Sequence, residues 1–114
     1  MPDRILIVDD DPDALYLYTH ASKKYGLEVD TATNFSDAQR KLRRLLPQYV
    51  VTDIHLEQNH DNKDGYKIAR EAKELGIKHV VIYSGTESPS QDISGVQVIE
   101  KPDLICWLEE NVKK

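Results

Sequence analysis

The sequence predicts an α/β fold, a doubly wound parallel sheet of five strands. Short apolar runs rich in β-branched residues alternate with segments of helical period, a pattern typical of a parallel sheet covered by helices. Three runs are continuously apolar, as strands buried on both faces must be, and we expect them at the centre of the sheet. They span residues 5–8, 49–51 and 80–83.

The individual elements follow in order along the chain. Strands are expected at 5–8, 28–32, 49–52, 79–83 and 96–99, and helices at 13–25, 36–46, 65–75 and 102–112. Asp11 is a suitable cap for the first helix, with Pro12 at its first position, and Ser36 opens a capping box for the second. Gly26 and Gly76 stand where left-handed helix caps are usual. The last helix has an apolar stripe of Leu104, Ile105, Trp107, Leu108 and Val112.

Two stretches break this regular alternation. Residues 84–95 offer a single apolar anchor, Ile93, so they can form at most one or two helical turns, and the fourth helix of the expected pattern is shortened or missing. Residues 57–64 are polar, with Asn, His and Asp and no apolar period. We expect a loop there, on the same side of the sheet as Asp53.

Composition limits the classes of function. The chain has 114 residues, 39% of them hydrophobic, and a net charge of −5, so we expect a single domain over 1–114 with no direct nucleic-acid or membrane role. The basic run at 40–44 is interpreted as a solvated helix face. Cys106 lies among apolar neighbours and is expected to be buried in a reducing compartment. No apolar run is long enough to span a membrane and no signal peptide precedes the first strand, which favours a cytoplasmic, stand-alone domain.

The segment 4–12 carries the most specific local signal. An apolar strand breaks into Asp9, Asp10 and Asp11 and then a helix-starting Pro. Adjacent carboxylates at a strand end repel one another unless a cation lies between them, which predicts a divalent metal site. The alternative is that one Asp caps the helix, as expected for Asp11, and the others are merely solvated.

Polar residues also follow the other strands. In a doubly wound sheet the carboxyl ends of the strands share one edge, and ligands bind there. This edge would gather Asp9, Asp10, Asp53, Ser84 and Lys101. Taken singly, each residue has an ordinary explanation as a helix cap, a turn residue or a surface cation. The combination is far more specific than any of its members.

This combination resembles the receiver domain of two-component response regulators, over residues 5 to about 112. The resemblance implies a flavodoxin-like sheet of strand order 2-1-3-4-5 and a signalling module rather than an enzyme. It implies that Asp53 accepts a phosphoryl group from a histidine kinase or histidine phosphotransfer protein. Mg²⁺ would be held by Asp9, Asp10, Asp53 and the backbone carbonyl of His55, and the Lys101-Pro102 peptide, commonly cis in the family, would aim Lys101 inward.

The residue chemistry is consistent with these roles. Mg²⁺ prefers carboxylate oxygens and water, and it neutralises charge on a transferring phosphoryl group. A carboxylate nucleophile at Asp53 would give an acyl phosphate of high transfer potential. Lys101 and Ser84 would pair with phosphoryl oxygens, one as a point charge and one as a hydroxyl donor.

Several positions depart from the family pattern. The loop between Asp53 and Gly65 is longer than usual and lacks the family's Pro, and His55 and Thr86 occupy positions that influence phosphoryl lifetime. Val98 replaces the aromatic switch residue three places before Lys101. With the fourth helix shortened as well, output must differ from the family's usual coupling. We expect apolar surface around the fourth and fifth strands to serve a downstream protein partner or a second copy in a homodimer.

Two rival functions are open at this point. A pseudo-receiver would share the fold and bind partners without ever being phosphorylated. A phosphatase of the haloacid dehalogenase type would also use an Asp nucleophile, but its general acid is a second Asp two residues on, where this chain has His55.

Overall fold

The structure, a computed structural model, describes residues 3–54, 64–84, 95–100 and 103–112. Within these ranges strands and helices alternate as the sequence predicts. The order is β1 (Arg4–Val8), α1 (Pro12–Lys24), β2 (Glu28–Ala32), α2 (Phe35–Leu45), β3 (Tyr49–Asp53), α3 (Asp64–Glu74), β4 (His79–Ser84), β5 (Val96–Glu100) and α4 (Leu104–Asn111). The expected shortening of a fourth helix concerns residues 84–95, and 85–94 lie outside the described residues.

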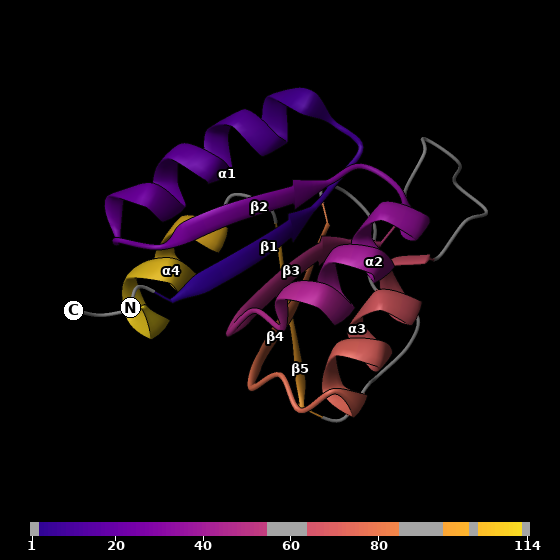
Figure 1. The fold of residues 1–114 in the computed structure, drawn as a ribbon. Helices are drawn as coiled ribbons and strands as arrows, with labels where there is room; N and C mark the ends of the chain where they lie inside the picture. Colours follow the sequence, from indigo (N-terminus) through magenta and orange to yellow (C-terminus); the bar gives the residue numbers. More distant parts are fainter. Residues whose placement is uncertain (1–2, 55–63, 85–94, 101–102, 113–114) are drawn as a thin grey trace.

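The five strands form one parallel sheet in the order β2-β1-β3-β4-β5, as expected. The three continuously apolar strands β1, β3 and β4 occupy its centre, which confirms their assignment. Figure 1 shows the sheet with α1 and α4 on one face and α2 and α3 on the other. This is the doubly wound arrangement, with every strand's carboxyl end at a common edge.

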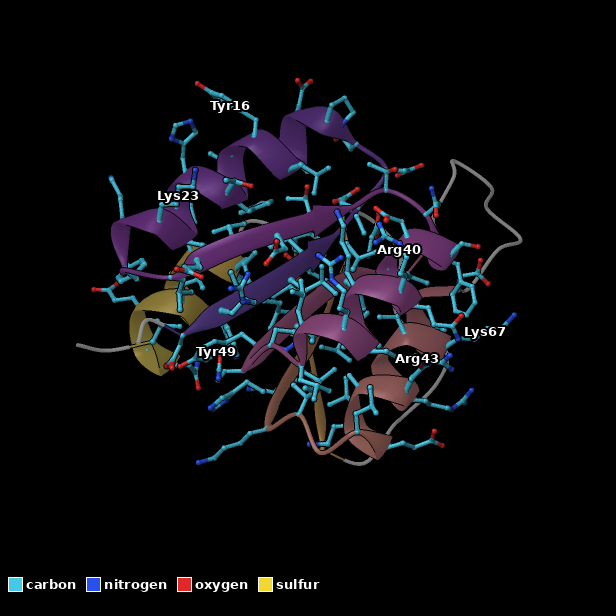
Figure 2. The ribbon with its side chains drawn as sticks, viewed as in Figure 1. Tyr16, Lys23, Arg40, Arg43, Tyr49 and Lys67 are labelled. Atoms are coloured by element: carbon cyan, nitrogen blue, oxygen red, sulfur yellow. The ribbon has the colours of Figure 1, made fainter. Side chains whose placement is uncertain are left out.

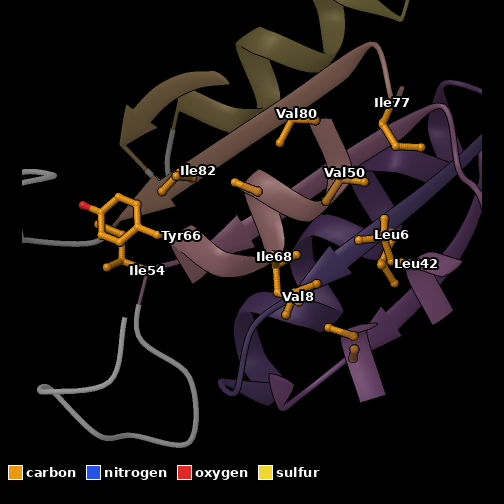
Figure 3. Packing of buried hydrophobic residues seen from close by; sticks show 14 residues of the cluster. Leu6, Val8, Leu42, Val50, Ile54, Tyr66, Ile68, Ile77, Val80 and Ile82 are labelled. Carbon is orange, nitrogen blue, oxygen red and sulfur yellow. The ribbon is translucent and has the colours of Figure 1, made fainter. Parts of the chain in front are cut away.

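Alternate residues of each central strand belong to two separate hydrophobic cores, one on each face of the sheet. On β1, Leu6 and Val8 pack with α2 and α3, whereas Ile5 and Ile7 pack with α1 and α4. Figure 3 shows the first core, where side chains from the sheet meet Leu42 of α2 and Ile68 of α3. Burial on both faces explains why these strands read as continuous apolar runs rather than as alternating patterns.

The predicted cap of α1 is confirmed, and the predicted cap of α2 is wrong. The Asp11 side chain accepts a hydrogen bond from the backbone N–H of Asp13 at 3.0 Å, so Asp11 caps α1 as predicted. The capping box expected at Ser36 is wrong, because α2 begins one residue earlier and its cap is Asn34, which accepts from the Asp37 N–H at 2.8 Å. Starting there brings Phe35 into contact with the core below α2.

The apolar stripe of α4 is narrower than predicted. Leu104, Trp107, Leu108 and Val112 are buried, at the i, i+3, i+4 and i+8 spacing of one helical face. Ile105 is 40% exposed and Cys106 is exposed, so the expectation that both are buried is wrong. Cys106 lies on the opposite side of the helix from Leu104 and Leu108, and Ile105 lies at the margin of the buried stripe.

The arginines of the basic run at 40–44 are exposed on α2, as expected, whereas Lys41 is only partly exposed and donates to the Thr31 carbonyl. Arg40 pairs with Asp37 within the helix, and Arg43 pairs with Glu71 of α3. Figure 2 shows Arg40, Arg43 and Lys67 of α3 on the exterior. Arg40 and Arg43 therefore form ion pairs with acidic residues on the same surface. Within the described ranges, no helix combines the length and the apolar character that a membrane crossing requires.

Candidate functional site

Three carboxylates meet at the carboxyl edge of the sheet. Asp9 and Asp10 directly follow β1, and Asp53 is the last residue of the neighbouring strand β3. One carboxylate oxygen from each lies within 4.8 Å of the others. The pairing of Val8 with Thr52 explains this convergence, because the residues that follow them lie side by side where both strands end. Asp10 and Asp53 are partly exposed, whereas Asp9 is completely buried.

Asp9 is held from three directions. Its backbone N–H donates to the Ala32 carbonyl at 3.0 Å, its Oδ1 accepts from the Asp11 N–H at 3.0 Å, and its Oδ2 accepts from the Tyr83 hydroxyl at 2.7 Å. A buried carboxylate requires such donors, since burial without them costs several kcal/mol, roughly. The hydrogen bonds therefore allow Asp9 to keep a defined position at the floor of the cluster.

Tyr83, near the end of β4, has no exposed surface. Burial raises the pKa of its phenol above the ordinary value, and the neighbouring charge of Asp9 and the hydrogen bond to it act in the same direction. The phenol is therefore a hydrogen-bond donor to Asp9. Its ring packs edge-on against Tyr18 of α1, with ring centroids 5.4 Å apart.

Asp53 is fixed by the chain on either side of the loop that follows it. Its Oδ1 accepts from the Ile54 N–H at 2.8 Å, and the Gly65 N–H donates to the Ile54 carbonyl at 3.0 Å. A β-carbon on Gly65 would lie 1.8 Å from the Asp53 carbonyl oxygen. The start of α3 therefore lies directly on the end of β3, at a distance that only glycine permits.

The donor set fits a small hard cation. Three carboxylates so close together repel one another, and a divalent ion relieves that repulsion while using the oxygen ligands that Mg²⁺ prefers. Asp10 and Asp53 are accessible to solvent, which leaves room for the water ligands that Mg²⁺ usually retains. The chemistry of this cluster is thus compatible with magnesium binding.

The other predicted site residues are only partly described. Ser84 ends β4 at the same edge and pairs in register with Glu100 of β5, so the chain continues from there to Lys101. The side chain of Ser84 lies outside what the structure describes, as do His55, Lys101 and the Lys101-Pro102 peptide. The structure thus brings Asp9, Asp10 and Asp53 together and leaves the remaining assignments as predictions.

The sequence reasoning missed Tyr83 and the role of Gly65. The apolar pattern predicts Tyr83 only as part of a central strand, although it stands next to Ser84 at the edge where the acidic residues gather. The pattern predicts Gly65 only as the start of a helix. The available signal for Tyr83 was a hydroxyl at the last buried position of a central strand, which requires a hydrogen-bond partner.

Comparison with known sequences identifies a family, and two of the curated relatives are described here. The family model described as response regulator receiver domain matches residues 5–102. A protein-glutamate methylesterase/protein-glutamine glutaminase 1 of Anaeromyxobacter dehalogenans (strain 2CP-C) is 32% identical over all of this chain, which covers 34% of that relative. An uncharacterized 14.6 kDa protein of Leptolyngbya boryana is 34% identical over 62% of this chain and 51% of its own length. The chain thus spans about a third and about half of these relatives, respectively.

Solved structures show the same fold. A response regulator receiver protein from Sinorhizobium medicae WSM419 is similar with a TM-score of 0.78 and 23% identity, covering 98% of each chain. A CheY-like receiver domain protein from Methanospirillum hungatei JF-1 gives a TM-score of 0.76 at 20% identity, over 98% of this chain and 94% of the other. At these identities the similarity shows the shared architecture.

Proposed function

The chain belongs to the response regulator receiver family, and on that premise we propose that it accepts a phosphoryl group on Asp53, with Mg²⁺ bound by Asp9, Asp10 and Asp53. The donor would be a histidine kinase or a histidine phosphotransfer protein. The whole of 1–114 would act as one receiver domain in the cytoplasm. The observation that supports this proposal best is the convergence of three carboxylates from two strands at one edge.

The chemistry assigns a separate task to each carboxylate. When bound, Mg²⁺ would neutralise charge on the phosphoryl oxygens. Buried Asp9 and partly exposed Asp10 would form the floor and the rim of the cation site. Asp53 is accessible, so one of its oxygens can attack phosphorus in line. A phosphorus–oxygen bond to Asp53 then forms as the phosphorus–nitrogen bond of the donor phosphohistidine breaks, and the leaving imidazole keeps the electron pair and takes up a proton.

The proposal includes the residues beyond the carboxylates. Ser84 would donate a hydroxyl hydrogen bond to a phosphoryl oxygen, and Lys101 would supply a compensating positive charge. The carbonyl of His55 would be a further cation ligand. The backbone position of Ser84 at the end of β4 supports its part in this arrangement.

Output would run through protein contacts near β5. Val98 of β5 is 43% exposed at the position where the resemblance to receiver domains leads one to expect an aromatic switch residue. An apolar side chain at this exposed position suits a protein partner or a second copy of the chain. Phosphorylation would regulate that contact.

The direct test is phosphorylation by a small-molecule donor. The purified protein is treated with acetyl phosphate and Mg²⁺, and the intact mass is measured for the gain of one phosphoryl group. Wild type should gain it and Asp53→Asn should not. The matched control is Asp11→Asn, because Asn keeps the cap of α1 while one carboxylate of the same acidic run is removed.

Each outcome separates the candidate functions. Phosphate on wild type and on Asp11→Asn, but not on Asp53→Asn, supports the receiver mechanism. A folded wild type that takes no phosphate would contradict it and leave a pseudo-receiver, an interaction module of the same fold. Steady release of phosphate from a generic phosphatase substrate would instead indicate the phosphatase alternative.

A further inference from the structure

We propose that Tyr83 is a positioning residue, one that orients the carboxylate of Asp9 for cation binding through its hydroxyl. This inference deepens the proposed function and depends on the cation site that the function requires. The phenol contacts Asp9 and not the phosphoryl group, so it acts through the ligand.

The sheet register places Tyr83 in the row of the acidic cluster. Tyr83 of β4 pairs with Asp53 of β3, and Asp9 follows the β1 residue that pairs with Thr52. Asp9, Asp53 and Tyr83 are therefore successive members of one row across three central strands. The phenol is long enough to extend past Asp53, and its hydroxyl lies 2.7 Å from Asp9 Oδ2.

The ring of Tyr83 is held in place on the α1 side of the sheet. It belongs to the core between the sheet, α1 and α4, and it packs edge-on against Tyr18 of α1. Neither Tyr83 nor Asp9 has exposed surface. A donor fixed this way restricts the rotation of its acceptor more than a solvent-exposed donor would, because the ring cannot follow the carboxylate.

The hydrogen bonds leave Asp9 with a defined orientation. Oδ1 accepts from the Asp11 N–H and Oδ2 accepts from the phenol, so rotation of the carboxylate would break one bond or both. Hydrogen bonds to an ionised acceptor are among the stronger ones in proteins. Partners of this kind orient metal ligands, and their loss typically lowers metal affinity roughly 10- to 100-fold.

The test measures cation affinity rather than phosphorylation. Mn²⁺ serves as the probe, because carboxylate sites for Mg²⁺ also accept it and free Mn²⁺ is counted by electron paramagnetic resonance. Tyr83→Phe keeps the ring and removes the hydroxyl. The matched control is Tyr49→Phe, which removes a buried phenol of the same core whose hydroxyl contacts the Asn111 carbonyl at the opposite edge of the sheet.

We expect Tyr83→Phe to weaken Mn²⁺ binding by about tenfold or more, and Tyr49→Phe to leave it unchanged. In an Asp9→Asn background, Tyr83→Phe should cause no further loss, since its effect passes through Asp9. Equal affinity of wild type and a folded Tyr83→Phe would overturn the inference, and so would a full additional loss in the Asp9→Asn background.

A second measurement avoids reliance on the variant's folding. In wild type carrying tyrosine labelled with ¹³C at the ζ carbon, the Tyr83 signal should shift on addition of Mg²⁺, while the Tyr49 signal should not. An unmoved Tyr83 signal at saturating Mg²⁺ would contradict the inference. Cation binding that depends on Tyr83, without any phosphate gained at Asp53, would contradict the proposed function alone.

Discussion

The contact between Gly65 and Asp53 gives the sharpest prediction from the structure. A β-carbon on Gly65 would lie 1.8 Å from the Asp53 carbonyl oxygen and 2.8 Å from the Ile54 α-carbon. Both obstacles are backbone atoms, so no side chain can rotate away. Since carbon and oxygen approach no closer than about 3.3 Å in close backbone contacts, Gly65→Ala must separate α3 from the end of β3 by roughly 1.5 Å.

The expected cost follows from two opposing effects. Overpacking a closely packed site costs about 1–3 kcal/mol or more, and the better helix propensity of alanine returns at most about 1 kcal/mol. A net loss of about 2 kcal/mol lowers the melting temperature of a domain of this size by roughly 8 °C. The displaced residue is the proposed acceptor, so Gly65→Ala should also slow phosphorylation by acetyl phosphate.

Gly76→Ala is the matched control. Gly76 has φ +85° with nothing within 4 Å of an added β-carbon, so alanine there costs about 1–2 kcal/mol of backbone strain far from the acidic cluster. Both variants should melt earlier than wild type by calorimetry, but only Gly65→Ala should be phosphorylated more slowly below its melting temperature. A Gly65→Ala protein with wild-type stability and wild-type phosphorylation would refute the reasoning.

Two further predictions concern sites away from the cluster. Burial of His79, together with the charges of Lys78 and Lys73, lowers the pKa of its imidazole below the ordinary value of 6.5. The unfolded chain therefore binds the proton more tightly than the folded one. The free energy of unfolding should fall as pH drops below 6.5 and level off below the pKa of the folded state. Urea unfolding between pH 8 and 5 should show this fall in wild type and in a variant of the exposed His20, and a smaller fall in His79→Gln. Val98→Glu places a charge on a half-exposed side chain, so it should change the free energy of unfolding by less than about 0.5 kcal/mol. It should abolish any dimer of wild type seen by light scattering, and a dimer that survives the change would exclude Val98 from that contact.

The sheet was predictable because its determinants are local. β1, β3 and β4 are apolar at every position from 5 to 8, 49 to 51 and 80 to 83, as strands covered on both faces must be. The strand order came from the family resemblance and was confirmed. For these strands the apolar sequence and the burial of both faces agree.

The predictions for α4 are wrong where residues adjacent in sequence lie on different sides of the helix. Cys106 lies between Ile105 and Trp107 in the sequence, but it is two residues from both Leu104 and Leu108, so at about 100° per residue it lies on the other side of α4 from them. Counting in steps of three and four from Leu104 would have separated the buried residues from the exposed ones. This correction was available from the sequence.

The start of α2 could not be predicted from the sequence in the same way. Asn34 and Ser36 are both favoured caps, and Ser36 is followed three residues later by Gln39, which would complete a capping box. The choice depends on Phe35, which joins the helix and packs against the core when Asn34 is the cap. Packing therefore decided between two local solutions of similar quality.

The acidic site has some features that the local sequence determines and others that depend on packing. Strand ends alone placed Asp9, Asp10 and Asp53 together, because parallel strands share an edge and no packing detail is needed. Tyr83 required more, since its hydroxyl reaches Asp9 across the intervening strand only when the ring is directed by the core beneath α1. A buried hydroxyl in the last row of a central strand must still find an acceptor, and the carboxylates of that row are the nearest ones. The residues beyond the strand ends therefore identify the candidate ligands, and the last buried residue of each central strand identifies candidates for the groups that orient those ligands.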